Sequence, residues 1–475
     1  MKTLLLNPPS FGGFDGGAGA RYQARREIRS FWYPTWLAYP AAMIEGSRLL
    51  DAPVAGIGAD AVIQEARGYD LVVMSTSTPT VGHDVRLAER IKDACPGIMT
   101  GVVGPHAVVR PEETLQSSAA IDFVTTGEFD YAVAEIAGGL PLEKVAGIVY
   151  RRNGRVCRTE DRPPLEDLDA LPFVTPIYKR DLDISQYYNG YLKHPYVSFY
   201  TGRGCRARCT FCLWPQTISG HAYRVRSAGS VYEETALTKD LFPEMKELFF
   251  DDDTFTDNAA RAVEIARRIK GLGLTWSCNS RANSSKETMK ELKDSGLRLL
   301  TVGFESGSQK ILNNVKKGIR VEQAREFVRA TKELGILVHG AFILGLPGET
   351  AQTIEETMRY ALELDLYSIQ VSLAAPYPGT GLYAQGLKEG WIVREGEGLT
   401  SDGIQNAAIS YEHLSREEIF GAVERFYRRY YLRPRPILRI LREMLQDKDE
   451  FGRRIREGRE FFSFMAKRKE AVGTR

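Results

Sequence analysis

The stretch at residues 196–215, YVSFYTGRGCRARCTFCLWP, constrains the fold most, because it places three cysteines directly after a strand. Residues 197–201 are β-branched or aromatic and predict a buried strand, which two glycines then end. Thiolates this closely spaced can share one iron–sulfur centre and leave one iron open to a non-protein ligand. A zinc site is the alternative, but structural zinc takes four protein ligands. The candidate ligands are Cys205, Cys209 and Cys212.

The spacing CxxxCxxC, with the aromatic Phe211 before the last cysteine, resembles the motif of the radical S-adenosylmethionine (SAM) superfamily. In that superfamily the cysteines hold a 4Fe–4S cluster, and the amino and carboxylate groups of SAM cap its open iron. An electron from the cluster cleaves SAM to a 5′-deoxyadenosyl radical. The resemblance therefore implies an enzyme that needs SAM, the cluster and an electron donor such as flavodoxin or ferredoxin.

Length and composition set the broad class of the protein. A chain of 475 residues predicts two or three domains, and an apolar content of 43% supports real cores. It has no apolar run of about 18 residues that could span a membrane, and the opening MKTLLLNPPS does not read as a signal peptide. Half of the six cysteines lie in one motif, which is typical of a reducing compartment. We therefore expect a cytoplasmic enzyme.

Residues 1–150 predict a doubly wound α/β domain. Short apolar runs occur at residues 3–6, 71–74, 99–103 and 121–125, with helix-like stretches such as 85–94 and 131–137 between them. This alternation is typical of a parallel sheet that binds ligands at the carboxyl ends of its strands. Small or polar residues occupy those ends: Asn7-Pro8-Pro9, Ser75-Thr76-Ser77, Gly104-Pro105-His106 and Gly127-Glu128.

This first part resembles the Rossmann-like cobalamin-binding domain that often precedes a radical SAM core, through LNPP, GPH followed by PEE, and TGEFDY. The chain lacks the DxHxxG segment whose histidine ligates cobalt in many such domains. The resemblance implies either cobalamin without a histidine ligand or a domain that has lost cobalamin. We interpret the glycine-rich residues 15–20 as a flexible or substrate-facing loop. The implied cobalamin-binding residues are Ser75, Thr76, Gly104, His106, Gly127 and Glu128.

Residues 151–195, punctuated by prolines, predict a linker, and residues 196–387 predict six strand–helix units. After the strand before the cysteines, strands are expected at 247–250, 274–277, 299–303, 338–344 and 369–372. Glycines mark the helix ends between them. Repeated βα units predict a partial (βα)6 TIM-type barrel with its chemistry at the strand carboxyl ends. Its open side would suit a bulky substrate or a facing cofactor domain.

A SAM pocket needs hydrogen-bond acceptors for the ammonium group of SAM and a cation for its carboxylate. The protein backbone must also come close to the cofactor. The acidic run 251–253 lies where the superfamily binds the SAM amine, although Asp252 or Asp253 could instead face cobalamin or substrate. A solvated turn is the alternative for this run. Glu305 matches a ribose-binding position. Lys317 matches a carboxylate-binding position, with Lys316 beside it as the competing choice.

The segment AFILGLPGE resembles the strand that packs beside the adenine of SAM. Its residues Ile343 and Leu346 are the implied adenine contacts, and Arg281 stands at the end of an earlier strand. With Phe211, these residues complete the predicted SAM pocket.

Residues 388–475 predict a helical, basic C-terminal region. From residue 416 onward there are 17 Lys or Arg residues and 10 Asp or Glu residues. The region could pack on the barrel with a solvated basic face, or it could lie on anionic lipid headgroups. No stacking or RNA-binding motif accompanies the charge, so we expect no nucleic-acid partner.

Across its length the chain resembles the hopanoid biosynthesis-associated, cobalamin-binding radical SAM proteins. The resemblance lies in residues 6–40, GRGCRARCTFCLWPQT, FFDDDTFTDN and AAPYPGTGLY. It implies a hopanoid lipid substrate, contraction of its amino-sugar ring to a cyclitol ether, and peripheral contact with the inner face of the cytoplasmic membrane. Two alternatives are a cobalamin-dependent radical SAM methyltransferase and a non-enzymatic cobalamin or redox sensor. The intact cysteine motif argues against the sensor.

Overall fold

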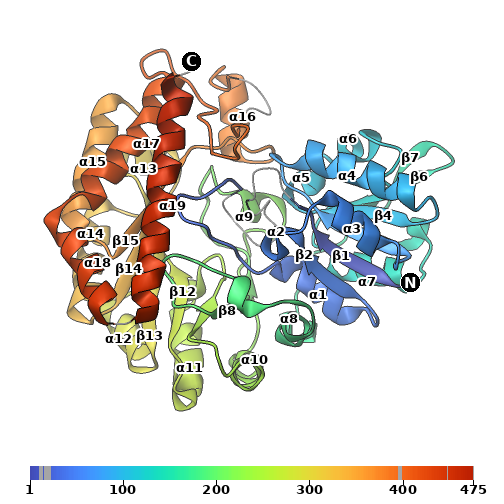
Figure 1. Cartoon of the computed structure of the whole chain (residues 1–475), viewed down its shortest axis with the longest axis horizontal. Helices are drawn as coiled ribbons and strands as arrows, with labels where there is room; N and C mark the ends of the chain where they lie inside the picture. The colour runs from blue at the N-terminus through green and yellow to red at the C-terminus, as the bar shows by residue number, and fades with distance from the viewer. Residues whose placement is uncertain (10–13, 15–22, 394–397, 447, 474–475) are drawn as a thin grey trace.

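The computed structural model describes residues 1–9, 14, 23–393, 398–446 and 448–473. The glycine-rich residues 15–20, for which we predict a loop, lie outside these ranges. Two α/β units lie side by side, and the C-terminal helices pack on the second unit (Figure 1). The predicted fold class, a doubly wound unit followed by a partial barrel and a helical extension, is confirmed.

The first sheet has seven strands in the order β2-β1-β3-β4-β5-β6-β7. The first five are parallel, and the order reverses between β1 and β3, which is where doubly wound sheets open a ligand crevice. The strands are β1 (Thr3–Asn7), β2 (Arg48–Asp51), β3 (Leu71–Ser75), β4 (Met99–Val103), β5 (Phe123–Thr125), β6 (Ile148–Arg152) and β7 (Arg155–Arg158). Its helices are α1 (Thr35–Met43), α2 (Ala52–Ala55), α3 (Ala59–Ala66), α4 (Val81–Ala94), α5 (Pro105–Val109), α6 (Pro111–Gln116) and α7 (Asp130–Ala137).

The sheet continues past residue 150 into the segment that the sequence predicts as linker. β6 and β7 form an antiparallel hairpin joined by Asn153 and Gly154, which both have positive φ angles of 50° and 76°. An Asn-Gly pair with these angles is the favoured two-residue hairpin turn. This hairpin signal was present in the sequence, and our prediction missed it.

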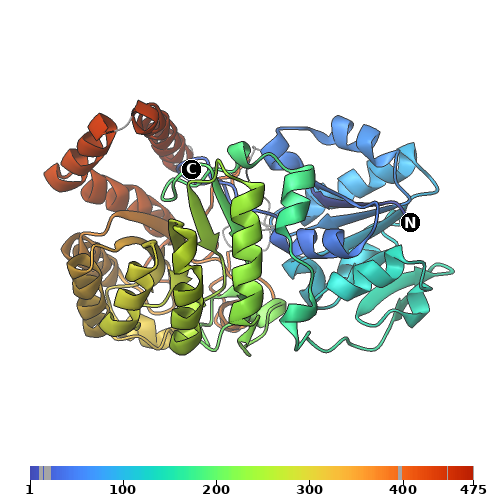
Figure 2. The same cartoon turned by 90° about the horizontal axis from the view of Figure 1, so that it is seen from below.

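The second sheet has six parallel strands in chain order, β15-β14-β13-β12-β11-β8, with helices on its outer face. This confirms the partial barrel (Figure 2). Its strands are β8 (Tyr196–Phe199), β11 (Glu247–Phe250), β12 (Trp276–Ser280), β13 (Leu297–Glu305), β14 (Leu337–Leu344) and β15 (Ser368–Leu373). Its helices are α9 (Leu213–Thr217), α10 (Ala228–Leu241), α11 (Ala259–Ile269), α12 (Lys286–Asp294), α13 (Gln309–Asn314), α14 (Val321–Glu333), α15 (Ala351–Leu364) and α16 (Gly381–Lys388).

The edge strand β15 is covered by α17 (Arg416–Tyr431). Its backbone N–H groups at Ile369 and Val371 donate to the hydroxyls of Tyr431 and Tyr427, each over 2.9 Å. The Gln405 side chain accepts from Leu373 N and donates to its carbonyl, each over 2.8 Å, as a neighbouring strand would. Side chains therefore satisfy backbone groups that an open edge would expose.

Two further helices, α18 (Pro434–Gln446) and α19 (Lys448–Gly473), pack against each other beside the barrel (Figures 1 and 2). Within the described ranges, no helix combines the length and the apolar character needed to cross a membrane.

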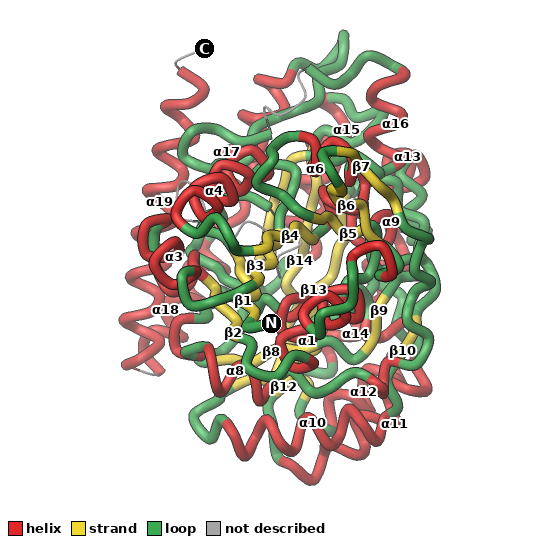
Figure 3. The backbone as a smooth tube through the Cα atoms, turned by 90° about the vertical axis from the view of Figure 1, so that its right-hand side faces the viewer, coloured by secondary structure: helices red, strands yellow, loops and turns green. Residues whose placement is uncertain are grey.

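The two units share one hydrophobic core, which runs from the first sheet through α8 (Thr175–Asp181) into the barrel. At their junction the Trp36 ring stacks on Trp214, with centroids 5.5 Å apart. The guanidinium of Arg203 lies 4.3 Å from the Trp36 ring centroid and makes two hydrogen bonds, of 2.7 and 2.9 Å, to the Asp130 carboxylate. Figure 3 views the molecule from the side of the first unit, with barrel strands lying behind it.

Asp130→Asn is expected to lower the free energy of unfolding by about 3 kcal/mol, because the buried guanidinium of Arg203 loses the carboxylate to which it donates two hydrogen bonds and keeps only Glu128, at 3.7 Å. The Arg203 and Asp130 side chains are each only 2% exposed. Asp161→Asn is the matched control: this carboxylate is 78% exposed and pairs with Arg158, so its loss should cost about 1 kcal/mol or less. Urea denaturation measures both. If the two variants unfolded at the same urea concentration, the buried Arg203–Asp130 pair would not hold the units together.

Candidate active site

The three cysteines lie on one loop that the backbone holds in place. Cys205 N donates to Gly220 O (3.2 Å), and Cys212 N donates to Cys209 O (3.3 Å). Gly204 has a φ of +92°, and a Cβ there would overlap the carbonyl oxygen of Ala222. Only glycine fits this close crossing, so the loop depends on it. Cys205 and Cys209 are buried, and Cys212 is half-buried.

The cysteine loop supplies the thiol donors that an iron–sulfur cluster takes. Burial, the Asp253 carboxylate and the other two cysteines raise the pKa of the Cys212 thiol well above its ordinary value. In the described part of the chain, no three His, Cys, Asp or Glu side chains gather as they would around one metal ion. A cluster is held by thiolates on separate iron atoms, so its cysteines need not meet at one point. The donor set of three thiols matches a cluster with one iron left open.

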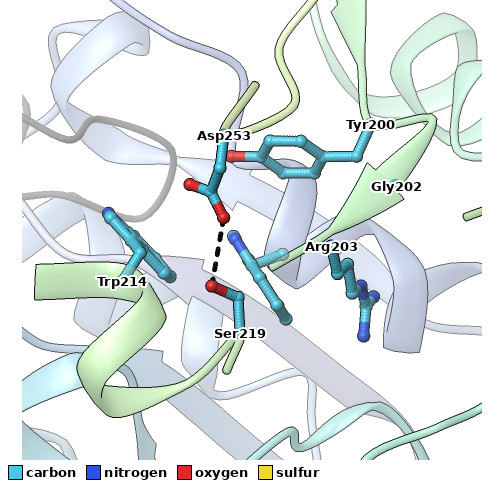
Figure 4. A pocket seen from close by; sticks show the side chains of 7 residues that line it. Tyr200, Gly202, Arg203, Trp214, Ser219 and Asp253 are labelled. Atoms are coloured by element: carbon cyan, nitrogen blue, oxygen red, sulfur yellow. Dashed lines mark hydrogen bonds between the residues drawn. The ribbon is translucent and has the colours of Figure 1, made fainter. Parts of the chain in front are cut away.

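Two aspartates of the acidic run after β11, Asp252 and Asp253, have different surroundings. Asp252 is fully buried and accepts hydrogen bonds from Thr201 Oγ1 (2.7 Å) and Tyr223 OH (2.8 Å). Asp253 is half-buried, accepts from Ser219 Oγ over 3.1 Å (Figure 4), and contributes to the raised thiol pKa values of Cys205 and Cys212. Asp253 is therefore the acid that borders the cysteine loop. The sequence alone did not separate the two.

A second charged group borders the same loop. Lys317 Nζ donates to Glu305 Oε1 over 2.7 Å, and both side chains are under 10% exposed. Although burial opposes its charge, the Glu305 carboxylate raises the pKa of Lys317. Arg281 donates to the Lys317 carbonyl and places Nη1 4.0 Å from Cys209 Sγ. Lys316 is exposed, so the buried lysine beside the cysteines is Lys317.

The three apolar residues predicted for the SAM pocket differ in exposure. Phe211 and Ile343 are half-buried, whereas Leu346 is fully buried. The GLPGE loop at the end of β14 is held by Glu349, whose Oε2 accepts from Gly345 N and Leu346 N. Burial raises the pKa of Glu349 to about 8. Our sequence reasoning missed this acid, although its position four residues after the strand-end Gly345 invites such backbone contacts.

Four of the six predicted cobalamin residues gather at the ends of β3 and β4. Thr76 N donates to Val103 O (2.8 Å), and a Cβ at Gly104 would overlap the Thr76 carbonyl oxygen. His106 Nδ1 lies 3.1 Å from Thr78 Oγ1, so the ring nitrogen makes a hydrogen bond within this loop. Ser75 is buried at the end of its strand.

The other two, Gly127 and Glu128, follow β5. Gly127 is half-buried, and Glu128 forms ion pairs. Its carboxylate accepts from both terminal nitrogens of Arg224 and lies 3.7 Å from Arg203 Nη1. These charges keep the pKa of Glu128 low despite its burial. Glu128 thus pairs with arginines of the barrel unit across the junction, which is a joining role that the sequence did not indicate.

A small cavity of about 10 Å³ lies at the junction between the two units. Asp253 and Ser219 face it from the cysteine side (Figure 4). Trp36, from the first unit, also lines it. The cysteine loop and the first unit therefore meet at this point.

Comparison with known families decides the class of this protein. The model of the radical SAM superfamily matches residues 199–361, and the model of the B12 binding domain matches residues 24–137. The chain is a radical SAM enzyme with a cobalamin-binding domain. Its cofactors are a 4Fe–4S cluster, SAM and cobalamin, as predicted from the sequence. An enzyme is therefore the better interpretation of this chain than a non-enzymatic cobalamin or redox sensor.

Several relatives of this enzyme carry the names of methyltransferases. It is 29% identical to an uncharacterized methyltransferase of Pyrococcus horikoshii, over 93% of this chain and 95% of that one. It is 26% identical to the cytidylyl-2-hydroxyethylphosphonate methyltransferase of Streptomyces wedmorensis, over 82% and 83%. The anaerobic magnesium-protoporphyrin IX monomethyl ester cyclase of Rubrivivax gelatinosus is also 26% identical, over 81% and 70%.

Two solved structures share the fold of this radical SAM enzyme. The cobalamin-dependent enzyme OxsB, with aqua-cobalamin and SAM bound, superimposes with a TM-score of 0.68 at 15% identity, over 99% of this chain and 71% of that one. The methyltransferase TsrM from Kitasatospora setae gives 0.64 at 17% identity, over 84% and 78%. At these identities the likeness concerns the fold alone.

Proposed function

We propose that this enzyme is a cobalamin-dependent radical SAM methyltransferase. The observation that carries the proposal is the junction of the two units, where the cysteine loop with Asp253 faces Trp36 of the cobalamin-binding domain. Methyl transfer between two cofactors requires their sites to face each other. Similarity to a named methyltransferase along nearly the whole chain supports the same activity. The hopanoid ring contraction implied by the sequence resemblance has less support.

The proposal gives a role to the charged residues that border the cysteine loop. Cys205, Cys209 and Cys212 would hold the cluster. Bound cofactors supply the difficult chemistry: the cluster provides the electron that cleaves SAM, and cobalamin carries the methyl group. We assign Asp253 to the ammonium of SAM, Lys317 to its carboxylate and Glu305 to its ribose hydroxyls. Arg281 positions Lys317 through its carbonyl. Phe211, Ile343 and Leu346 would exclude water from the adenine.

The domain boundaries are part of the proposal. We assign residues 1–150 to cobalamin, 151–195 to the linker, 196–387 to the SAM-binding barrel and 388–475 to a C-terminal extension. The hairpin strand β7 shows that part of the linker also extends the first sheet.

Ring contraction of a hopanoid is our second candidate, and one observation favours a lipid substrate. Three leucines of α18, Leu438, Leu441 and Leu445, are 64%, 47% and 86% exposed. Their spacing of three and four residues puts them on one helix face. An apolar helix face among arginines suits peripheral contact with an anionic membrane, and an electron donor would reach the enzyme from the aqueous side.

SAM carrying a deuterated methyl group separates the two candidates. The reconstituted enzyme is incubated anaerobically with reductant and an extract of cells that lack the protein. We expect both 5′-deoxyadenosine and S-adenosylhomocysteine to form, and the label to appear in a product that is heavier by one methyl group. Formation of 5′-deoxyadenosine alone, with a product of unchanged mass, would instead establish a rearrangement such as ring contraction.

A further inference from the structure

A cavity of about 330 Å³ lies between residues 24–32, which connect β1 to α1, and the C-terminal helix α19. Among the described side chains that line it, none is one that we assign to the cluster, to SAM or to cobalamin. Its volume lies within the range of sites that bind small molecules. The cavity is therefore a candidate site for a ligand that the proposed function does not name.

Three arginines of this cavity lack an acidic partner. Arg25 and Arg29 come from the connection between β1 and α1, and Arg459 comes from α19. Within the described ranges, none of the three side chains forms an ion pair. The guanidinium of Arg29 lies 4.9 Å from the ring centroid of Phe31, a position in which it can still donate its N–H groups to an anion. Three unpaired cations around one cavity point to an anionic ligand.

The acids of the cavity offset only part of this positive charge. Glu27 already pairs with the buried Arg26, at 3.4 Å. Glu460 accepts a hydrogen bond from the backbone N–H of Arg29 over 2.9 Å. The described lining holds four arginines and two glutamates, which leaves a net charge of +2. A phosphate monoester carries a charge of about −1.5 to −2 at pH 7, so it matches this excess, whereas a single carboxylate supplies about half of it.

Hydrogen bonds hold the chain segment that carries two of these arginines, so the cavity is preformed. Arg25 N donates to Gly403 O (2.7 Å), and Phe31 N donates to Tyr188 O (2.8 Å). A site that is already ordered loses less conformational entropy when it binds a ligand. The buried rings of Phe31 and Phe464 also line the cavity. Aromatic walls beside cations suit a phosphate that is attached to a small apolar group.

We infer that this cavity binds the phosphate monoester group of a ligand, and that Arg25, Arg29 and Arg459 hold its oxygens. Arginine suits this role because its planar guanidinium can donate two parallel hydrogen bonds to one phosphate. The inference goes beyond the proposed function, since the site lies apart from the three cofactors. The ligand would still touch the wall of the barrel unit, because Arg26 and Glu27 also line a neighbouring cavity that reaches β14 and β15.

The test is calorimetric titration of the anaerobic full-length enzyme with phenyl phosphate at about pH 8, where this phosphate is a dianion. We expect one saturable site. Arg29→Gln and Arg459→Gln should each weaken binding about tenfold, because each variant removes a charged hydrogen bond. Both side chains are exposed, so the fold should persist. Arg442→Gln is the matched control: it removes an exposed arginine of α18 that does not line the cavity, and it should leave binding unchanged.

Benzoate tests the charge of the ligand, because it has a similar ring but carries one negative charge. It should bind about tenfold more weakly than phenyl phosphate, since it offers fewer charged hydrogen bonds to the arginines. Equal binding of the two compounds would overturn the assignment to a phosphate monoester.

Vesicles that contain phosphatidic acid present the same phosphate monoester on a lipid, and sedimentation measures binding to them. Binding to vesicles alone, lost in Arg29→Gln and Arg459→Gln, would support this site with a lipid headgroup as its ligand, whereas binding of phenyl phosphate supports a soluble ligand. No binding of either probe would overturn the inference, and so would equal weakening by Arg442→Gln. Neither measurement involves turnover, so both results are independent of whether the enzyme transfers a methyl group.

Discussion

Cys209→Ala is expected to reduce the formation of 5′-deoxyadenosine to background and to lower the iron and sulfide content of the anaerobically reconstituted protein. The loop supplies three thiolates, and the open iron needs all three to remain bound. The change removes only the sulfur atom of a small buried side chain, so the fold itself should persist. Iron analysis and the visible absorption of the cluster measure the loss.

Cys157→Ala is the matched control for this prediction. Cys157 is a half-buried thiol on β7, in the first sheet, and has no part in the cysteine loop. Its alanine variant should keep a full cluster and full SAM cleavage. Full cluster content in Cys209→Ala would contradict the assignment of the three ligands, and with it the radical mechanism.

Lys317→Met is expected to weaken SAM binding by about 10- to 100-fold, because a charged hydrogen bond is worth about 1.5–3 kcal/mol. It should also lower the free energy of unfolding by about 3 kcal/mol, since the Glu305 carboxylate stays buried without its partner. Equilibrium binding of SAM and urea denaturation measure the two effects. Lys316→Met, at the exposed neighbouring position, should change neither.

A double variant separates binding from stability. Glu305→Gln combined with Lys317→Met removes both charges of the buried pair, so much of the lost stability should return. SAM binding should stay weak, because its carboxylate still lacks a cation. Recovery of SAM binding together with stability would show that Lys317 is a structural residue only.

Sequence patterns were sufficient to locate the six strands of the barrel. Runs such as 299–303 and 338–344 are rich in apolar residues, and each follows a helix that ends beside a glycine, so the apolar runs and the helix ends indicate the same fold. The short strand β2 and the β6–β7 hairpin were missed, because a strand of four or five residues with charged ends carries little periodic signal.

The site shows a different limit. Motif spacing located the cysteines and the acidic run, but it could not tell Asp252 from Asp253. That distinction depends on Thr201 and Tyr223, which the fold brings to Asp252 from another strand and loop. The ion pairs of Glu128, which we predicted as a cobalamin-binding residue, were missed for the same reason: its arginine partners lie far along the chain. Long-range partners decide which polar residues are committed to structure, and a local pattern does not contain them.

The continuous core beneath both units has a consequence for how such an enzyme can be divided. Aromatic side chains of the first unit, among them Trp36 and Phe129, belong to the same cluster as the barrel residues Trp214 and Phe250. A fragment holding either unit alone would present that surface to water and would aggregate rather than fold. Each half therefore acts as the other's scaffold, and a gene split between them should yield product only when both pieces are made together.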